Sequence, residues 1–191
     1  MRHRKILRDN ILGIKNPELK RIAYMAGANR IEDDIYEKLR NVIQAFLKKV
    51  CFISSEYISN ARIKTVKKEI VDYAIESSYK KVFYDGEELK KCKLYQGKRK
   101  NHMKFYQDKS IDCVQINKVG FVRLVKEMMQ DFKIDVNWSA RALTTLHIST
   151  EMMLIELLGY SVVVLLNREG KTLRVRDIET VQAISPLFKF E

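Results

Sequence analysis

The sequence predicts an all-α fold in which a unit of short helix, loop, long helix, loop and short helix occurs twice. Apolar residues recur at steps of three or four along two long segments, which is the period of one helix face. Only 7 Gly and 2 Pro occur among 191 residues, too few for the many turns of a sandwich, a barrel or a doubly wound sheet. The composition, 46% hydrophobic and 31% charged, is that of a folded globular protein.

The first unit begins at Asn16-Pro17, a good helix cap followed by the residue favoured in a first turn. This short helix is expected to run to about Ala26 and to stop at Gly27. Asp33-Asp34 then opens an uninterrupted helix of about 27 residues, judged from its apolar period. A basic loop over 62–66, a short helix over 67–78 and an extended tail over 80–84 complete the unit.

The second unit repeats this order. A helix is expected over 118–132, a loop over 133–138, and a second long helix that Ser139 caps. Gly159 inside this helix costs about 1 kcal/mol relative to Ala. A loop over 169–173 and a helix over 174–185 follow, and Pro186 ends the last helix. A further short helix over 103–112 is expected to precede the unit.

The length of the first long helix predicts how the two units are arranged. A helix of about 27 residues is about 40 Å long, whereas a compact unit of about 75 residues is only about 29 Å across. The apolar stripe continues to the helix end, so the overhang must be covered by the other unit. We therefore expect the two units to cross at their long helices in one intramolecular pair.

Several functional classes lack their motifs in this sequence. Three scattered cysteines and three isolated histidines offer neither a disulfide framework nor the ligand spacing of a zinc site. No Gly-rich phosphate loop and no Gly-x-Ser-x-Gly motif is present. The first residues lack the apolar core of a signal peptide, and no run of 18 apolar residues predicts a membrane span. We expect no enzymatic activity, no cofactor, no metal and no membrane partner.

The charge points to a polyanionic partner. The 36 Lys and Arg outnumber the 24 Asp and Glu, for a net charge of +12. Residues 1–86 carry a net charge of +7, residues 87–118 carry +5, and residues 119–191 are neutral. The basic runs in the middle segment fit a solvated linker, a linker that lies over phosphates, or a nuclear-import signal.

The first unit closely resembles core histone H-four. The resemblance covers about residues 2–84 and is carried by the run from Arg2 to Ile14, Pro17, Arg30-Ile31, Ile35-Tyr36-Glu37 and Lys64-Thr65-Val66. Over about residues 104–185 the chain resembles core histone H-three. This second resemblance is carried by Phe121, Arg123 to Glu127, Gln130 to Lys133 and Asp135. Tyr106-Gln107 and Lys109-Ser110 resemble the extra first helix of that histone.

The resemblance implies two histone folds in one chain, paired in the intramolecular handshake of a pseudo-heterodimer. Residues 1–86 would be the H-four-like fold, 87–103 a basic linker and 104–191 the H-three-like fold with its extra helix. A fused pair in this order is similar to the histone doublets of giant DNA viruses. The implied function is wrapping of double-stranded DNA without sequence choice, one chain serving as a dimer and two chains as a central tetramer.

The resemblance also assigns DNA-binding residues, because histones place cations and loop amides on phosphates. Arg30 would enter a minor groove, although a solvated loop arginine is the alternative. One site, formed jointly by a loop of each unit, would hold Arg62, Lys64, Thr65, Lys133 and Asn137. The equivalent site at the other loop pair would hold Arg30, Lys171 and Thr172. Further contacts are expected from Arg8, Lys20, Arg21, Lys109, Lys118, Arg123 and Lys126. Asn137 stands where the family has an arginine, so one groove contact is expected to be missing.

Partner surfaces follow from the same resemblance. Tyr57, Tyr73 and Phe83 match positions where histone H-four binds the H-two-A/H-two-B pair, which would here be two separate histones or a fused doublet. A second copy of the chain is expected to bind at Val164, Asn167, Asp177 and Val181. The expected location is chromatin, in a nucleus, a viral factory or a virion. A histone-fold transcription factor outside any nucleosome and an adaptor for acidic proteins are the alternative functions.

Overall fold

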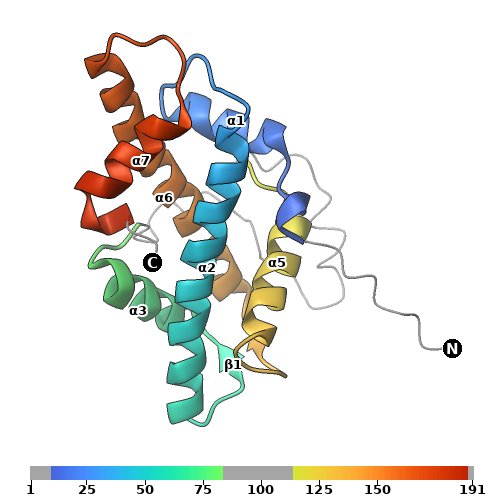
Figure 1. Ribbon diagram of the computed structural model, residues 1–191. Helices are drawn as coiled ribbons and strands as arrows, with labels where there is room; N and C mark the ends of the chain where they lie inside the picture. Colours follow the sequence, from blue (N-terminus) through green and yellow to red (C-terminus); the bar gives the residue numbers. More distant parts are fainter. Residues whose placement is uncertain (1–9, 84–113, 189–191) are drawn as a thin grey trace, which may run out of the picture.

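The computed structural model describes residues 10–83 and 114–188, and these are mostly helical (Figure 1). The described helices are α1 (Asn16–Met25), α2 (Ile35–Asn60), α3 (Lys68–Tyr79), α5 (Lys118–Gln130), α6 (Ala140–Asn167) and α7 (Val175–Ile184). Two 3-10 turns, η1 (Asn10–Gly13) and η4 (Pro186–Phe188), flank them. The predicted order of short, long and short helix is therefore present on both sides of residues 84–113. The helix expected over 103–112 and the linker lie outside the described residues.

The helix ends fall within one or two residues of their predicted positions. Ser139 caps α6 as expected, because its side-chain oxygen accepts a hydrogen bond from the Ala142 N–H at 3.1 Å. The cap predicted for α1 is wrong: Asn16 is already helical, and the Lys15 N–H before it donates to the Glu18 carboxylate at 3.2 Å. The extended tail is also wrong over residues 80–83, where Lys80 ends α3 with a left-handed φ of 52°.

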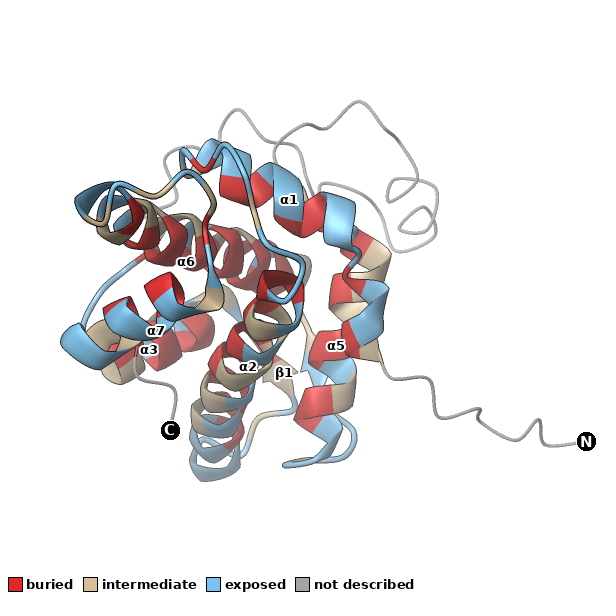
Figure 2. Cartoon of the chain, turned by 45° about the horizontal axis from the view of Figure 1, so that its top comes forward, coloured by how far each residue is buried: buried red, intermediate tan, exposed pale blue. Residues whose placement is uncertain are grey.

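The two long helices, α2 and α6, lie across each other at the centre of the molecule (Figures 1 and 2). Helix α1 packs mainly on α6 and α5 mainly on α2, so each leading helix covers the long helix of the other half. Helix α3 contacts both α2 and α6, and α7 packs against α6. The inward faces are buried (Figure 2), and Phe46 and Phe121 are among the largest side chains with no exposure. The long apolar stripes are thus covered from both halves of the chain.

Helix α6 is more apolar than expected, because no membrane span was predicted from the sequence. Within the described residues it is the one helix that is long and apolar enough to cross a membrane, and half of its most apolar window is buried inside the protein. The same helix also buries polar side chains, among them Thr144, Thr150 and Glu151. Its contacts with α1, α2, α3 and α7 account for the apolar composition, because a helix packed on several sides has little surface left for charge.

Two pairs of loops join the halves at opposite ends of the long helices. Strand β1 (Thr65–Val66) pairs in parallel with β2 (Asn137–Trp138), with Thr65 opposite Asn137. At the other end a parallel bridge joins Ile31 to Leu173. The register at the first pair is fixed by the Asn137 N–H, which donates to the Lys64 carbonyl at 2.9 Å. Each loop of one half is therefore tied by its backbone to a loop of the other half.

The loop between α6 and α7 is closed by a buried ion pair. The Asp177 side chain is 1% exposed and accepts hydrogen bonds from two nitrogens of Arg168, at 2.7 and 2.8 Å. It also accepts one from the Arg174 N–H at 2.9 Å. Gly170 leaves room for this arrangement, because a Cβ there would lie 2.2 Å from the Arg168 guanidinium. Asp177 therefore contacts its own chain, and its predicted place on a surface for a second copy is wrong.

Removing the Asp177 charge should destabilise the fold in a pH-dependent way. Burial alone would raise the pKa of Asp177, but the hydrogen bonds from Arg168 and the Arg174 N–H outweigh it and hold the pKa below its ordinary value. The charge therefore stabilises the fold above that ordinary value, and this stability is lost as the pH falls through the lowered native pKa. Asp177→Asn should lower the free energy of unfolding by about 2 kcal/mol near neutral pH.

Chemical denaturation at several pH values measures this effect. Asp72→Asn is the matched control, because Asp72 is partly exposed and pairs with Lys68 at only 3.8 Å. Its loss should stay below about 0.5 kcal/mol. Equal losses for the two variants at neutral pH, or an Asp177→Asn deficit that persists at about pH 2, would contradict the assignment.

Candidate nucleic-acid interface

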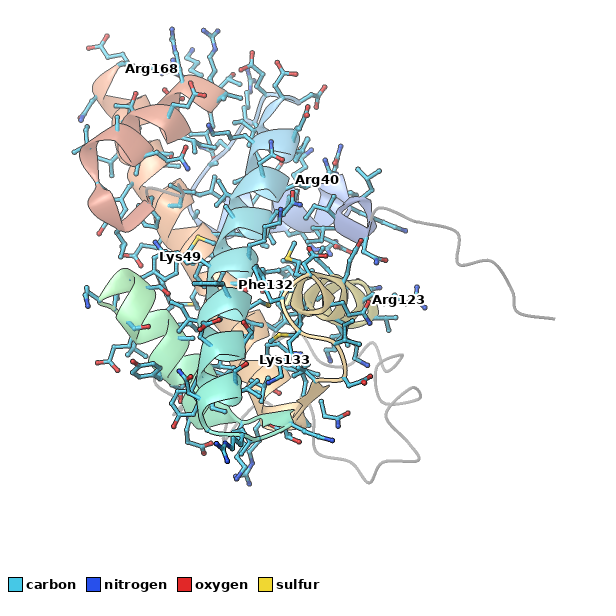
Figure 3. The ribbon with its side chains drawn as sticks, turned by 60° about the horizontal axis from the view of Figure 1, so that its bottom comes forward. Arg40, Lys49, Arg123, Phe132, Lys133 and Arg168 are labelled. Atoms are coloured by element: carbon cyan, nitrogen blue, oxygen red, sulfur yellow. The ribbon has the colours of Figure 1, made fainter. Side chains whose placement is uncertain are left out.

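The loop pairs gather the DNA-binding residues predicted in the loops into two groups, one at each end of α2 (Figure 1). We call residues 60–67 and 131–139 the Thr65 end, and residues 26–34 and 168–174 the Arg30 end. Figure 3 shows Lys133 and Arg168 toward opposite ends of α2. Since α2 has 26 residues, the two ends lie about 39 Å apart.

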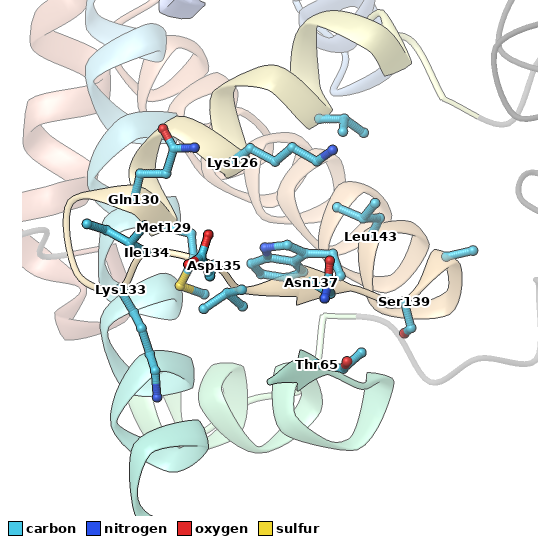
Figure 4. Close-up of a pocket in the computed structure, with 14 residues that line it drawn as sticks. Thr65, Lys126, Met129, Gln130, Lys133, Ile134, Asp135, Asn137, Ser139 and Leu143 are labelled. Atoms are coloured by element: carbon cyan, nitrogen blue, oxygen red, sulfur yellow. The ribbon is translucent and has the colours of Figure 1, made fainter. Parts of the chain in front are cut away.

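The Thr65 end brings together all five residues predicted for the first joint site. Thr65 and Asn137 are register partners, so their side chains come from adjacent strands (Figure 4). Arg62 and Lys64 are exposed in the loop, and Arg62 has a left-handed φ of 54°. The Lys133 ammonium donates to the Ser59 hydroxyl at 3.0 Å, which ties the two loops together. A pocket of about 940 Å³ lies beside them, with Lys126, Lys133 and Asn137 among its lining residues.

The Arg30 end brings together the residues predicted for the equivalent site. The Leu173 N–H donates to the Arg30 carbonyl at 2.8 Å, and the Glu32 N–H donates to the Leu173 carbonyl at 3.1 Å. The side chains of Arg30 and Lys171 are exposed and line one pocket of about 310 Å³. Thr172 is half-buried, and its carbonyl accepts a hydrogen bond from Arg168 at 2.6 Å.

Four of the five cations predicted on the leading helices are exposed. Lys20 on α1 is exposed, and a hydrogen bond with the Tyr24 hydroxyl raises its pKa, so it remains charged. Arg21 is exposed but donates to the Gln115 side chain at 2.8 Å. Arg123 and Lys126 on α5 are exposed.

Lys118 is the exception among the cations on the leading helices. It is 8% exposed, because α5 begins there against the rest of the fold. Its predicted phosphate contact is therefore not supported, and we leave it out of the interface. Arg8 and Lys109 lie outside the described residues.

The chemistry available at these surfaces is that of cations, amides and hydroxyls. Within residues 10–83 and 114–188 no three His, Cys, Asp or Glu side chains are grouped as metal ligands. The Cys51 thiol is enclosed in the core, and burial raises its pKa to about 12. It stays protonated at neutral pH and is a poor nucleophile. The exposed cations, amides and hydroxyls are suited to binding phosphates.

The first predicted partner surface is present in part. The rings of Tyr57 and Tyr73 lie 5.7 Å apart and are 43% and 53% exposed. Phe83, predicted to join them, is instead 7% exposed and packs edge-on against Phe46 and Tyr79. Its assignment to a partner surface is wrong, because the ring completes an aromatic cluster of its own chain.

The second predicted partner surface has a different composition from the expected one. Asn167 is exposed and Val164 is half-buried, but Val181 is 4% exposed and belongs to the core with Asp177, so its assignment is wrong too. Large apolar side chains are exposed there, and one of them, Leu166, was expected on the buried stripe of the long helix. These are Tyr160, Val163, Leu166 and Ile184, with exposed fractions of 50%, 53%, 65% and 75%.

Comparisons with known proteins agree with this geometry. Residues 96–184 match the model of the core histone domain that histones H-two-A, H-two-B, H-three and H-four share. The structure is also similar to that of a histone from Methanopyrus kandleri, with a TM-score of 0.60. The chain has the histone fold. That alignment covers 90% of this chain and 95% of the archaeal one at 14% sequence identity, so it shows the fold alone.

Two further cations of this histone fold, one in the Thr65 end and one just beyond it, were not among the predicted DNA-binding residues. Lys67 is exposed directly before α3, and Arg141 is exposed in the first turn of α6. Lys67 lies two residues after the predicted Thr65, and Arg141 lies two residues after the helix cap Ser139. Their position next to a helix start was the available signal, because helix N-termini are where phosphates bind.

Restoring an arginine at the Thr65 end should add a phosphate contact. Asn137 is exposed, and its strand partner Thr65 adjoins Lys64. Asn137→Arg should therefore tighten DNA binding, steepen its salt dependence by about one unit and slow nuclease attack on the DNA it faces. Asn41→Arg, an equal change on the exposed face of α2, is the control. If both variants change the salt slope alike, or Asn137→Arg changes nothing, the assigned position is wrong.

Proposed function

We propose that the chain packages double-stranded DNA without sequence choice, as a core histone of the nucleosome type. The observation that carries this proposal is the pair of loop ends, each with exposed cations beside backbone amides, at the two ends of α2. A duplex that touches both ends can bind through its phosphates alone. The match of residues 96–184 to the core histone domain supports the proposal, as does the net charge of +12.

We further propose that one chain supplies both members of a histone dimer. Residues 1–86 would be the H-four-like fold, 87–103 a linker and 104–191 the H-three-like fold. Three features support an intramolecular handshake: the repeated helix order, the crossing of α2 with α6, and the cross-packing of α1 and α5. The archaeal histone supports it too, because a single chain of similar length aligns over 95% of itself.

In this proposal two chains form the centre of the particle. The exposed apolar side chains at the end of α6 and on α7 give each chain a surface that can meet its own copy across a two-fold axis. Tyr57 and Tyr73 would receive H-two-A/H-two-B-like histones. The corresponding location is chromatin. The resemblance to viral histone doublets extends the proposed location to a viral factory or a virion.

Nuclease digestion of particles reconstituted on long DNA tests the proposed function. Protected fragments of discrete length, with an H-two-A/H-two-B source present, support a nucleosome-type histone. Binding without discrete protection favours a histone-fold transcription factor outside a nucleosome. Absence of binding to DNA would remove the proposal altogether.

The contribution of Arg30 should appear equally on every DNA sequence. Arg30→Ala removes one exposed cation from the Arg30 end, so it should weaken binding and lower the salt slope by about one unit. Arg176→Ala removes an exposed arginine of α7 outside both loop ends and should leave the slope unchanged. A loss restricted to one DNA sequence would show that Arg30 contacts bases specifically.

Self-association should depend on the apolar surface of α6. Leu166→Glu places a charge on the apolar surface that the proposed pairing buries, and should convert paired chains to single chains that still bind DNA. Leu12→Glu is the matched control, because Leu12 is also 65% exposed but lies in η1. Light scattering of DNA-free protein at high salt measures the change. Pairing that survives Leu166→Glu, or that is never seen in the parent protein, would exclude this assembly.

A further inference from the structure

The two loop ends differ in charge although the helix order around them is the same. The Thr65 end carries exposed cations at Arg62, Lys64 and Lys67, and the loop before β2 adds two acids, Asp131 and Asp135. We propose that the Thr65 end holds DNA tightly, and that the Arg30 end is the one from which DNA is released first. This inference rests on the proposed function, because it concerns how strongly each end of one DNA surface binds.

The cations of the Thr65 end are available to phosphates. Among the described ion pairs none involves Arg62, Lys64 or Lys67. Lys133 uses its ammonium on the neutral Ser59 hydroxyl, which leaves its charge uncompensated. Arg141, in the first turn of α6, adds a further exposed cation at a helix start, where the helix dipole also favours an anion.

The Arg30 end has a less favourable balance of charge, because it carries more acidic side chains. The Arg168 guanidinium is held by both oxygens of Asp177, so its charge is compensated within the protein. Glu169 is exposed in the same loop with a left-handed φ of 54°, at the position that Arg62 occupies after α2. Arg30, Lys171 and Arg174 are exposed at this end, but the carboxylates around them offset their charge.

Acidic side chains also occupy the start of α2. Glu32, Asp33 and Asp34 are all exposed, and Asp34 is the residue directly before the helix. A helix N-terminus would ordinarily attract a phosphate, but three carboxylates at this point satisfy the helix dipole and repel one. At the Thr65 end the residues directly before α3 and α6 are Lys67 and Ser139, neither of which carries a negative charge. Helix α7 at the Arg30 end follows Arg174, so the acidic helix start is that of α2.

The distance between the ends prevents one from compensating the other. They are about 39 Å apart along α2, whereas charges are screened over about 8 Å at physiological salt. Each end must therefore bind its own phosphates with its own charges. Because the residues of both ends belong to one chain, every copy of the protein carries one tight end and one weak end.

Hydrogen exchange of the loop amides in the full chain bound to long duplex DNA tests this inference. As salt is raised, protection by DNA should be lost at residues 30–32 and 173 before it is lost at residues 64–66 and 137–139. Loss at the same salt concentration, or in the reverse order, would overturn the inference while leaving DNA packaging intact. If DNA protects neither loop pair at any salt concentration, the proposed function itself fails.

A charge-matched pair of triple variants identifies the cause. Glu32→Gln, Asp33→Asn and Glu169→Gln together should tighten DNA binding about tenfold and bring the release of the Arg30 end to the salt range of the Thr65 end. Asp34 is retained, because it adjoins the first turn of α2. The control combines Glu56→Gln, Asp72→Asn and Glu76→Gln, which lie outside both ends. Equal tightening in both triple variants would mean that only net charge matters, and would overturn the inference.

Discussion

The length of the two central helices is the constraint on which the rest of this fold depends. Helices of 26 and 28 residues are about 39 and 42 Å long, and a unit of about 75 residues is too small to enclose either one. Crossing the two helices lets each half cover the overhang of the other. The crossing then places the end of α2 beside the start of α6, so the flanking loops can pair through their backbones.

Polar groups within the core give this packing a single register. The buried carboxylate of Glu151 accepts hydrogen bonds from the N–H groups of Gln115 and Ile116 at 2.8 and 2.7 Å, which fixes the segment before α5 onto α6. His147, one turn earlier, stacks on Phe121 at 4.2 Å and lies 3.5 Å from the Glu151 carboxylate. Apolar surfaces can slide past each other, whereas directional hydrogen bonds to a buried charge are lost by any slip.

The sequence predicts the helices of this fold better than it predicts which of their side chains are exposed. Helix periods, the Ser139 cap and the pairing of the halves follow from local patterns and from length, and these need no knowledge of what each face meets. Exposure depends on tertiary contacts, and the sequence-based assignments fail there. Leu166 continues an apolar stripe but lies beyond the crossing, and Phe83 and Lys118 were assigned to the surface but are buried by neighbouring elements. The sequence alone indicates that Asp177 is a surface charge, because its hydrogen bond with Arg168 depends on the loop conformation.

Fusion of the two halves separates their tasks. Partners joined by one chain meet at an effective concentration of about millimolar, so their pairing does not depend on how much protein is present. The second half therefore does not need charges of its own to stay beside the first half, and residues 119–191 are in fact neutral. Its surface is free to be apolar at the end of α6, where charge would oppose contact with another protein. In the proposed packaging of DNA, the first half, with a net charge of +7 over residues 1–86, would supply most of the attraction to phosphate.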